Sequence, residues 1–300
     1  MVSLSKPLLE ALYNSCTYFL PANFACCSGG LKNIEYSFGI GYGLSMAFVG
    51  TTLALQSTGY SVSSLIQSIA NIFSQSTQSQ ISLFGSLLYT THGLRTLFFV
   101  LRRRNFFSNL GQSGFAEKGA EIQEKSDKMP IFVKGLISFF VAKIIALYSI
   151  PLQLAYNQAE VAKTISASTT STSFVPAFSL LAVSTFGLLI ETIADEQKQT
   201  FKKANPKRPM MSGLFSNIMH ANYTGEVLFH LGMFGLVLDL SGTSLSYVEQ
   251  ILSMFGPLYM TYVMFGAARR LDREGLKKYG ENADYKKWRE GSWSLIPGVF

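Results

Sequence analysis

The sequence predicts an all-α protein, a polytopic bundle of transmembrane helices, and three observations support this fold class. Hydrophobic residues make up 48% of the 300 residues and charged residues only 14%, which is too apolar for an ordinary soluble domain. Apolar runs of about 20 residues, the length that crosses a bilayer as a helix, recur along the chain. Lys and Arg gather in alternate connecting segments, as they do when those segments stay on one side of a membrane.

Six apolar runs are long enough to be spans. They cover residues 38–57, 81–101, 131–155, 173–193, 222–240 and 247–266. An earlier run, residues 8–27, is interrupted by Glu10, Asn14, Pro21 and Asn23. We therefore predict an N-terminal interfacial segment over residues 1–37, with a seventh span as the alternative, and a single transmembrane domain over residues 38–300.

The basic residues predict the orientation. The second run is followed by Arg102, Arg103 and Arg104, and the fourth run by a basic loop. That loop contains Lys198, Lys202, Lys203, Lys207 and Arg208. Residues 58–80 and 241–247 contain no Lys or Arg. Because Lys6 and Lys32 precede the first span, both termini are expected on the basic side. This bias also explains the net charge of +7, so nucleic acid is not an expected partner.

Cysteine usage gives no further site. Cys16, Cys26 and Cys27 are too few and too clustered for a disulfide framework or a structural zinc site, and no metal is expected. The N-terminal residues lack the pattern of a signal or transit peptide, so no cleaved leader is expected.

Ionisable residues inside the spans are costly in a bilayer and indicate function by default. They form three pairs that each share one helix face: His92 with Arg95, Glu191 with Asp195, and Glu226 with His230. The basic loop joins the helices of the last two pairs, so their polar ends should converge on it. That combination suits a phosphate-bearing ligand whose neutral part enters the bundle. The structural alternative is that these side chains reach to the headgroups or merely pair with one another.

Two segments carry a family resemblance. The first is "IETIADEQKQTFKKANPKRPMMSGLFSNIMHANYTGEVLFHLGMF" and the second is "LDREGLKKYGENADYKKWREGSWSLIPGVF". The order of their motifs, including Gly213-Leu214-Phe215, Asn222-Tyr223 and Gly225-Glu226, resembles the C-terminal half of the steroid 5-alpha-reductase superfamily, nearest its DUF1295 members. The resemblance covers residues 190–300.

The resemblance implies a reductase that holds NADPH from the basic side and delivers hydride to a carbon-carbon double bond of a lipid or steroid-like substrate. It implies that Glu191 and Asp195 lie near the ribose and adenine end of the cofactor, and that Lys202 meets a phosphate. Asn222, Tyr223 and Glu226 would hold the nicotinamide amide and its ribose. Residues 190–300 would thus form the dinucleotide-binding half.

The C-terminal segment is expected to complete that half. Arg269, Arg270 and Tyr285 leave the last span on the face of the basic loop, so we expect an amphipathic tail that folds back over the nucleotide. The alternative is an ordinary interfacial anchor with aromatic and basic residues at headgroup level.

The proton donor is harder to identify. Reduction of an enone needs an acid, and the steroid reductases use a membrane-embedded Glu with a Tyr. Residues 36–116 and 131–159 contain no Asp or Glu. His92, Tyr89 and Arg95 are the candidates that remain.

Two other functions stay open. One is a non-catalytic accessory subunit or assembly protein of a larger membrane complex, which the missing acid favours, as does Met219-His220-Ala221 where DUF1295 members carry Arg-His-Pro. The other is an isoprenylcysteine-type methyltransferase, whose C-terminal half is similar; Asn222 with Gly225-Glu226 favours the reductase. The expected partners are membrane lipids, a lipid-like substrate and, for the accessory role, other subunits. The resemblance favours the endoplasmic reticulum, with the mitochondrial inner membrane as the alternative.

Overall fold

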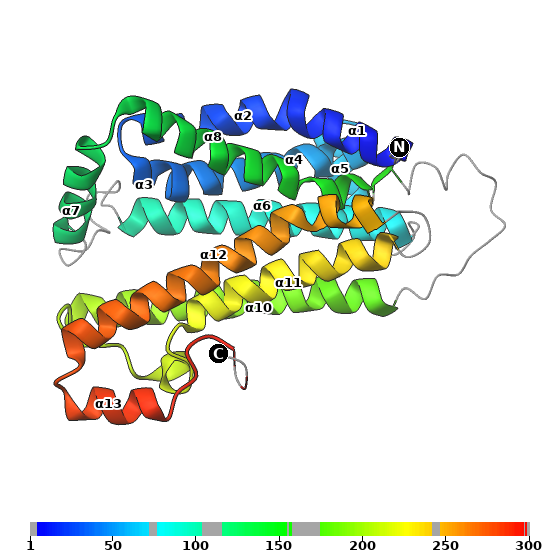
Figure 1. Ribbon diagram of the computed structural model, residues 1–300. Helices are drawn as coiled ribbons and strands as arrows, with labels where there is room; N and C mark the ends of the chain where they lie inside the picture. Colours follow the sequence, from blue (N-terminus) through cyan, green and yellow to red (C-terminus); the bar gives the residue numbers. More distant parts are fainter. Residues whose placement is uncertain are drawn as a thin grey trace.

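The structure is a computed structural model that describes residues 5–71, 77–103, 116–154, 156–157, 175–241, 247–296 and 298. Within these ranges every named element is a helix, and the extended backbone pairs only at one isolated bridge, between Ile218 and Trp293. The long helices run side by side in one bundle (Figure 1). The predicted all-α membrane bundle is confirmed.

Each predicted span falls on a helix. The first combines α3 (Ile34–Tyr36), a π-helical turn (Ser37–Gly41) and α4 (Tyr42–Ser57). The others are α6 (Thr77–Arg103), α8 (Ile131–Tyr148), α10 (Val175–Ala204), α11 (Ala221–Ser241) and α12 (Tyr247–Tyr279). The shorter helices are α1 (Lys6–Asn14), α2 (Leu20–Cys27), α5 (Val62–Ala70), α7 (Ala116–Asp127) and α13 (Ala283–Glu290).

Four helical stretches in the described ranges are long and apolar enough to cross a bilayer: Ile34–Ser57, Ile131–Leu154, Ala177–Ala204 and Gln250–Tyr279. The other two predicted spans, α6 and α11, lie in the same bundle but carry ionisable residues that lower their hydropathy. The helices α10 and α12 continue past the predicted ends at residues 193 and 266. Glu, Lys and Arg are good helix formers, so both helices extend beyond their apolar parts.

The N-terminal run packs against the bundle. Its helical turns, from Lys6 to Leu31, pack along α8, and Leu8 is buried in a cluster with Ile150 and Leu154. Its polar residues find partners there, because Asn23 donates to the Ala142 carbonyl (3.5 Å) and Ser15 contacts Ser149 (3.1 Å). This packing favours the seventh-span alternative for residues 1–37.

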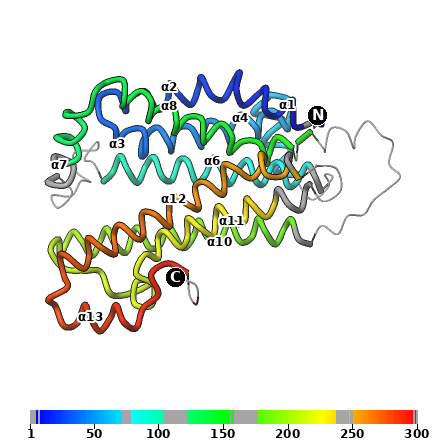
Figure 2. Tube along the Cα trace, viewed as in Figure 1, coloured from blue at the N-terminus to red at the C-terminus, as the bar shows by residue number. Residues whose placement is uncertain are grey.

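The expectation that both termini share one side of a membrane stays a prediction, and the position of the N-terminus bears on it. Figures 1 and 2 show α1 beginning at one end of the bundle and α13 lying at the other. Lys6 lines a surface hollow with Gln56, at the end of α4, and Tyr156, which follows α8. The polar residues of the run are unfavourable in a membrane span. Their contacts with α8 and the residue that follows it reduce that cost.

Two helix pairs are joined by close backbone contact. A Cβ placed on Gly93 of α6 would lie 2.2 Å from the Ala47 nitrogen of α4, and one on Gly225 of α11 would lie 2.4 Å from the Glu191 nitrogen of α10. Small residues of this kind let helices approach closely in membranes, where dispersion contacts drive association. The α4/α6 pair and the α10/α11 pair meet where α6 packs on α10.

The C-terminal segment folds back as predicted. After α13, the Trp293 carbonyl accepts from the Met219 nitrogen (2.8 Å), and the Trp293 nitrogen donates to the Asn217 carbonyl (2.9 Å). The Trp288 indole donates to the Phe215 carbonyl (2.9 Å). These bonds hold the tail against the segment that precedes α11.

Candidate functional site

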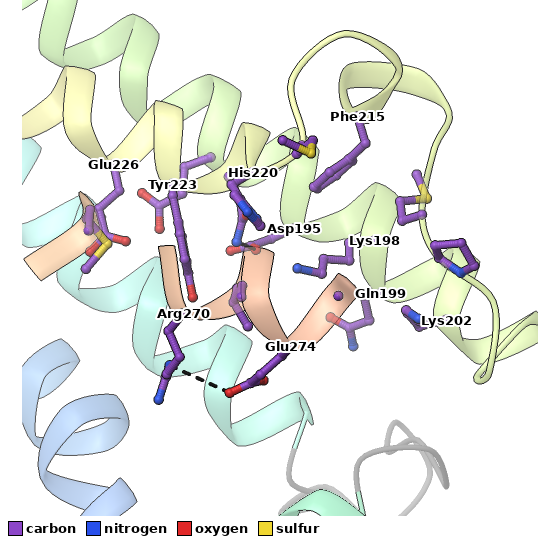
Figure 3. Close-up of a pocket in the computed structure, with 18 of the residues that line it drawn as sticks. Asp195, Lys198, Gln199, Lys202, Phe215, His220, Tyr223, Glu226, Arg270 and Glu274 are labelled. Carbon is purple, nitrogen blue, oxygen red and sulfur yellow. Dashed lines mark hydrogen bonds and ion pairs between the residues drawn. The ribbon is translucent and has the colours of Figure 1, made fainter. Parts of the chain in front are cut away.

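A cavity of about 660 Å³ lies between α6, α10, α12, the start of α11 and the tail. Figure 3 shows side chains from α10, among them Asp195 and Lys198, and from α12, among them Arg270, converging on this space. The volume lies within the range of small-molecule and cofactor sites.

Most of the sequence-predicted site residues line this cavity. The lining includes Arg95, Glu191, Asp195, Lys202, Asn222, Tyr223, Glu226, Arg270 and Tyr285. Residues separated by more than a hundred positions are therefore brought to one place. Burial raises the pKa of Tyr285, which lies outside the spans.

Arg95 is the centre of the charged floor of the cavity. Its guanidinium forms ion pairs with the carboxylates of Glu191 and Asp195, and also donates to the Glu191 carbonyl (3.1 Å). The three side chains are only 13%, 7% and 10% exposed. Glu191 and Asp195, which share one face of α10, are thus joined to Arg95 of α6.

Asn222 lies beside this cluster at the start of α11. Its amide nitrogen donates to Asp195 (3.1 Å), while its buried amide oxygen has no hydrogen-bond partner among the described residues. A buried acceptor without a partner is costly, because it has lost its bonds to water. Asn222 therefore has a free acceptor beside the cavity that it lines.

Two lysines of the basic loop make contacts within the chain. The Lys202 ammonium donates to the Arg208 carbonyl (2.5 Å) and lies 5.7 Å from the Tyr279 ring centroid. It ties the loop to the end of α10 and to α12. Lys198 lies over the Phe215 ring, 5.7 Å from its centroid.

His220 and Asp272 join α12 to the tail. The His220 Nε2 atom lies 2.7 Å from an Asp272 carboxylate oxygen, whose second oxygen accepts from the Ser294 hydroxyl (2.7 Å). Both His220 and Asp272 line the cavity. Asp272 carries no local signal in the sequence, because its partners lie 52 residues before it and 22 residues after it.

Three candidates lie outside the cavity wall. Arg269 is exposed, on a different face of α12 from Arg270. Tyr89 is buried in the bundle core, where its hydroxyl donates to the Tyr148 carbonyl (2.9 Å). His92 is fully buried behind the cavity, and its ring stacks on Phe229 with 4.4 Å between centroids.

Tyr42 is, like Asp272, a cavity residue that the sequence did not predict. It lines the cavity, and its hydroxyl lies 3.0 Å from His92 Nε2. The other ring nitrogen of His92 lies 3.6 Å from Glu191. Nothing in an apolar run distinguishes Tyr42 from its neighbours, so the contact with His92 is the only signal.

Comparison with known proteins gives one family. The family model described as "Protein of unknown function (DUF1295)" matches residues 54–291. A search of curated proteins and a search of solved structures find no match. The matched region extends from the end of α4 to the tail and includes all the predicted site residues. The chain belongs to the DUF1295 family.

Proposed function

We propose that this protein is a membrane-embedded reductase that uses NADPH to reduce a carbon-carbon double bond in a lipid or steroid-like substrate. The proposal follows the resemblance to the steroid 5-alpha-reductase superfamily. One observation carries it: a single cavity is lined by every residue assigned to the cofactor from the sequence except Arg269. We place the protein in the endoplasmic reticulum membrane, with the mitochondrial inner membrane as the alternative.

The residues present fit a dinucleotide. The unpartnered Asn222 oxygen suits the carboxamide NH₂ of nicotinamide, which is a hydrogen-bond donor. Aromatic rings of Phe215, Tyr223 and Trp288 line the cavity and offer flat apolar surfaces to planar rings. Cationic side chains at the rim, including Lys198 and Arg270, suit phosphates.

The contacts of Glu191 and Asp195 support a different role from the one that the resemblance implies. Both Asp195 oxygens are engaged, one with Arg95 and the other with Asn222. Asp195 would therefore act on the cofactor through Asn222, by fixing its amide so that the oxygen faces the nicotinamide. Glu191 would likewise hold Arg95. When bound, the dinucleotide supplies the hydride; these side chains orient it.

An accessory role, as a subunit or assembly protein that keeps the fold without turnover, is the second candidate. One observation favours it: the carboxylates on the cavity floor are paired within the chain, Glu191 and Asp195 with Arg95. A paired carboxylate is a poor proton donor. In that case a bound dinucleotide would have no enzymatic use.

Titration of NADPH fluorescence against the full chain in detergent tests the proposal. We expect the wild type to bind NADPH and Asn222→Ala to weaken binding by about 0.5–1.5 kcal/mol, the net value of one hydrogen bond. Asn217→Ala is the matched control, since Asn217 is exposed and does not line the cavity. A wild type that binds no dinucleotide at any salt concentration would reject the reductase in favour of the accessory role.

A further inference from the structure

Two of the three histidines lie in the interior of the bundle, directly behind the cavity. His92 and His230 are both fully buried, with 6.2 Å between their ring centroids. Each ring has one nitrogen on a tyrosine hydroxyl and the other turned toward a glutamate. Ionisable residues at such positions are expensive and indicate a function.

The first tyrosine-histidine pair reaches the cavity. Tyr42 lines it, and its hydroxyl lies 3.0 Å from His92 Nε2, with the two rings edge to face. His92 Nδ1 lies 3.6 Å from Glu191 Oε2, and neither of these two atoms has a hydrogen-bond partner in the part of the chain that the structure describes. Tyr42, His92 and Glu191 therefore form a series of proton-carrying groups. The series begins at Tyr42 in the cavity wall and ends at Glu191 on the cavity floor.

The second pair does not reach the cavity. The Tyr148 hydroxyl bonds to His230 Nδ1, and His230 Nε2 lies 3.7 Å from Glu226. Glu226 lines the cavity, but Tyr148 is buried in the core. A substrate in the cavity could meet the tyrosine of the first pair only.

We propose that Tyr42 donates the proton to the substrate double bond and that His92, backed by Glu191, restores it. This inference rests on the proposed reductase function and names the acid that the sequence lacked. Phe38 and Phe99 line the cavity with Tyr42, so the wall beside Tyr42 suits an apolar substrate.

The reaction balances with one hydride and one proton. Hydride from the reduced dinucleotide adds to one carbon of the double bond, and the π electrons move to the other carbon or to a conjugated carbonyl. The Tyr42 proton adds there, and its O–H electron pair stays on the phenolate. The phenolate takes a proton from His92 Nε2 as His92 gains one at Nδ1 that solvent supplies by way of the Glu191 carboxylate, so the net proton consumed comes from solvent. His92 then returns to its Nε2–H form before the next turnover.

The other candidates are less suited to this step. The Tyr89 hydroxyl is bonded to the Tyr148 carbonyl away from the cavity. Arg95 is held by two carboxylates and keeps its proton under all ordinary conditions. His92 itself is covered by Tyr42 and Phe229, so it acts through Tyr42 as a positioning and relay residue.

The test measures NADPH oxidation by the full chain in detergent with two lipid-soluble probes, 4-cholesten-3-one and trans-2-hexadecenal. We expect Tyr42→Phe to lower kcat by about 10²–10⁴-fold, the usual contribution of a general acid, with NADPH affinity unchanged. We expect His92→Gln to lower kcat without changing KM for NADPH. Its solvent deuterium isotope effect on kcat should rise, which a merely structural role would not cause.

Ser184→Ala is the matched control for loss of a buried hydroxyl, because Ser184 is fully buried and donates to the Phe229 carbonyl (3.0 Å) away from the cavity. It should keep the wild-type rate. A Tyr42→Phe protein that folds and reduces the probes as fast as the wild type would overturn the inference alone. A wild type that binds no NADPH would overturn the reductase function itself.

Discussion

Arg95 joins the two helix pairs through charge. Its guanidinium, on α6, meets two carboxylates on α10, and all three groups are nearly buried. A lone charge in that position would be strongly unfavourable, whereas a paired one is tolerated. The cluster also holds Asn222 through Asp195, so one arginine supports both the bundle and the cavity.

Replacing Arg95 tests this dependence. Arg95→Met leaves Glu191 and Asp195 buried without a countercharge, and breaking such a pair typically costs about 3–5 kcal/mol. Thermal unfolding in detergent should show a marked loss of stability. Adding Glu191→Gln and Asp195→Asn removes the stranded charges and should restore much of it.

Arg269→Met serves as the control, because Arg269 is an exposed arginine of α12. Its unfolding temperature should stay near that of the wild type. Equal stability of Arg95→Met and the triple variant would show that the ion pairs contribute little.

At the scale of the element, the lengths of α10 and α12 make the cavity. Both helices continue past their apolar parts, so their polar ends extend beyond the spans and form opposite walls. The tail then closes one side through Trp288 and the backbone bonds of Trp293. The cavity therefore lies at the end of the bundle that carries the basic loop.

The α10/α11 contact predicts a position-specific effect of adding one methyl group. A Cβ on Gly225 would lie 2.4 Å from the backbone nitrogen of Glu191, which cannot move without separating the helices. Overpacking of this kind usually costs about 1–3 kcal/mol. Gly225→Ala should therefore lower the unfolding temperature in detergent.

Gly266→Ala is the matched helical control. A Cβ on Gly266 meets nothing within 4 Å, and Ala is a better helix former than Gly. It should be neutral or slightly stabilising. If both substitutions had the same effect, close packing at Gly225 would not be what holds α10 and α11 together.

At the scale of the molecule, the chain has two unlike ends. One carries the cavity, the basic loop and the tail, and the other carries the start of α1 and α5. A full-length N-terminal helix separates Lys6 from the C-terminal tail by the length of the bundle. Under the proposed function, the cofactor would enter the cavity from water and the substrate from the lipid layer.

Labelling in sealed vesicles tests this arrangement. In a background without native cysteines, we expect a membrane-impermeant maleimide to label Lys6→Cys and Lys286→Cys from opposite faces, since both positions are exposed and lie at opposite ends. The Lys286 side should be the cytoplasmic or matrix face, because basic loops stay there. Labelling of both from one face would return the N-terminal run to the interfacial position.

Hydropathy and charge along the chain determined the fold class and the places of the long helices, because the bilayer imposes a length and a polarity on each helix separately. Residue types and spacing marked Glu191 with Asp195 and Glu226 with His230 as candidates for one site, and the family resemblance added Asn222. Only the tertiary structure decided how they pair. Arg95 neutralises carboxylates on another helix, and in the N-terminal run Asn23 donates to the Ala142 carbonyl and Ser15 contacts Ser149, so a run that looked too polar packs against the bundle. Tyr42 gained its place in the cavity in the same way, through a bond to His92 fifty residues away. Such partners are set by packing between helices, and a pattern along one chain segment does not encode them.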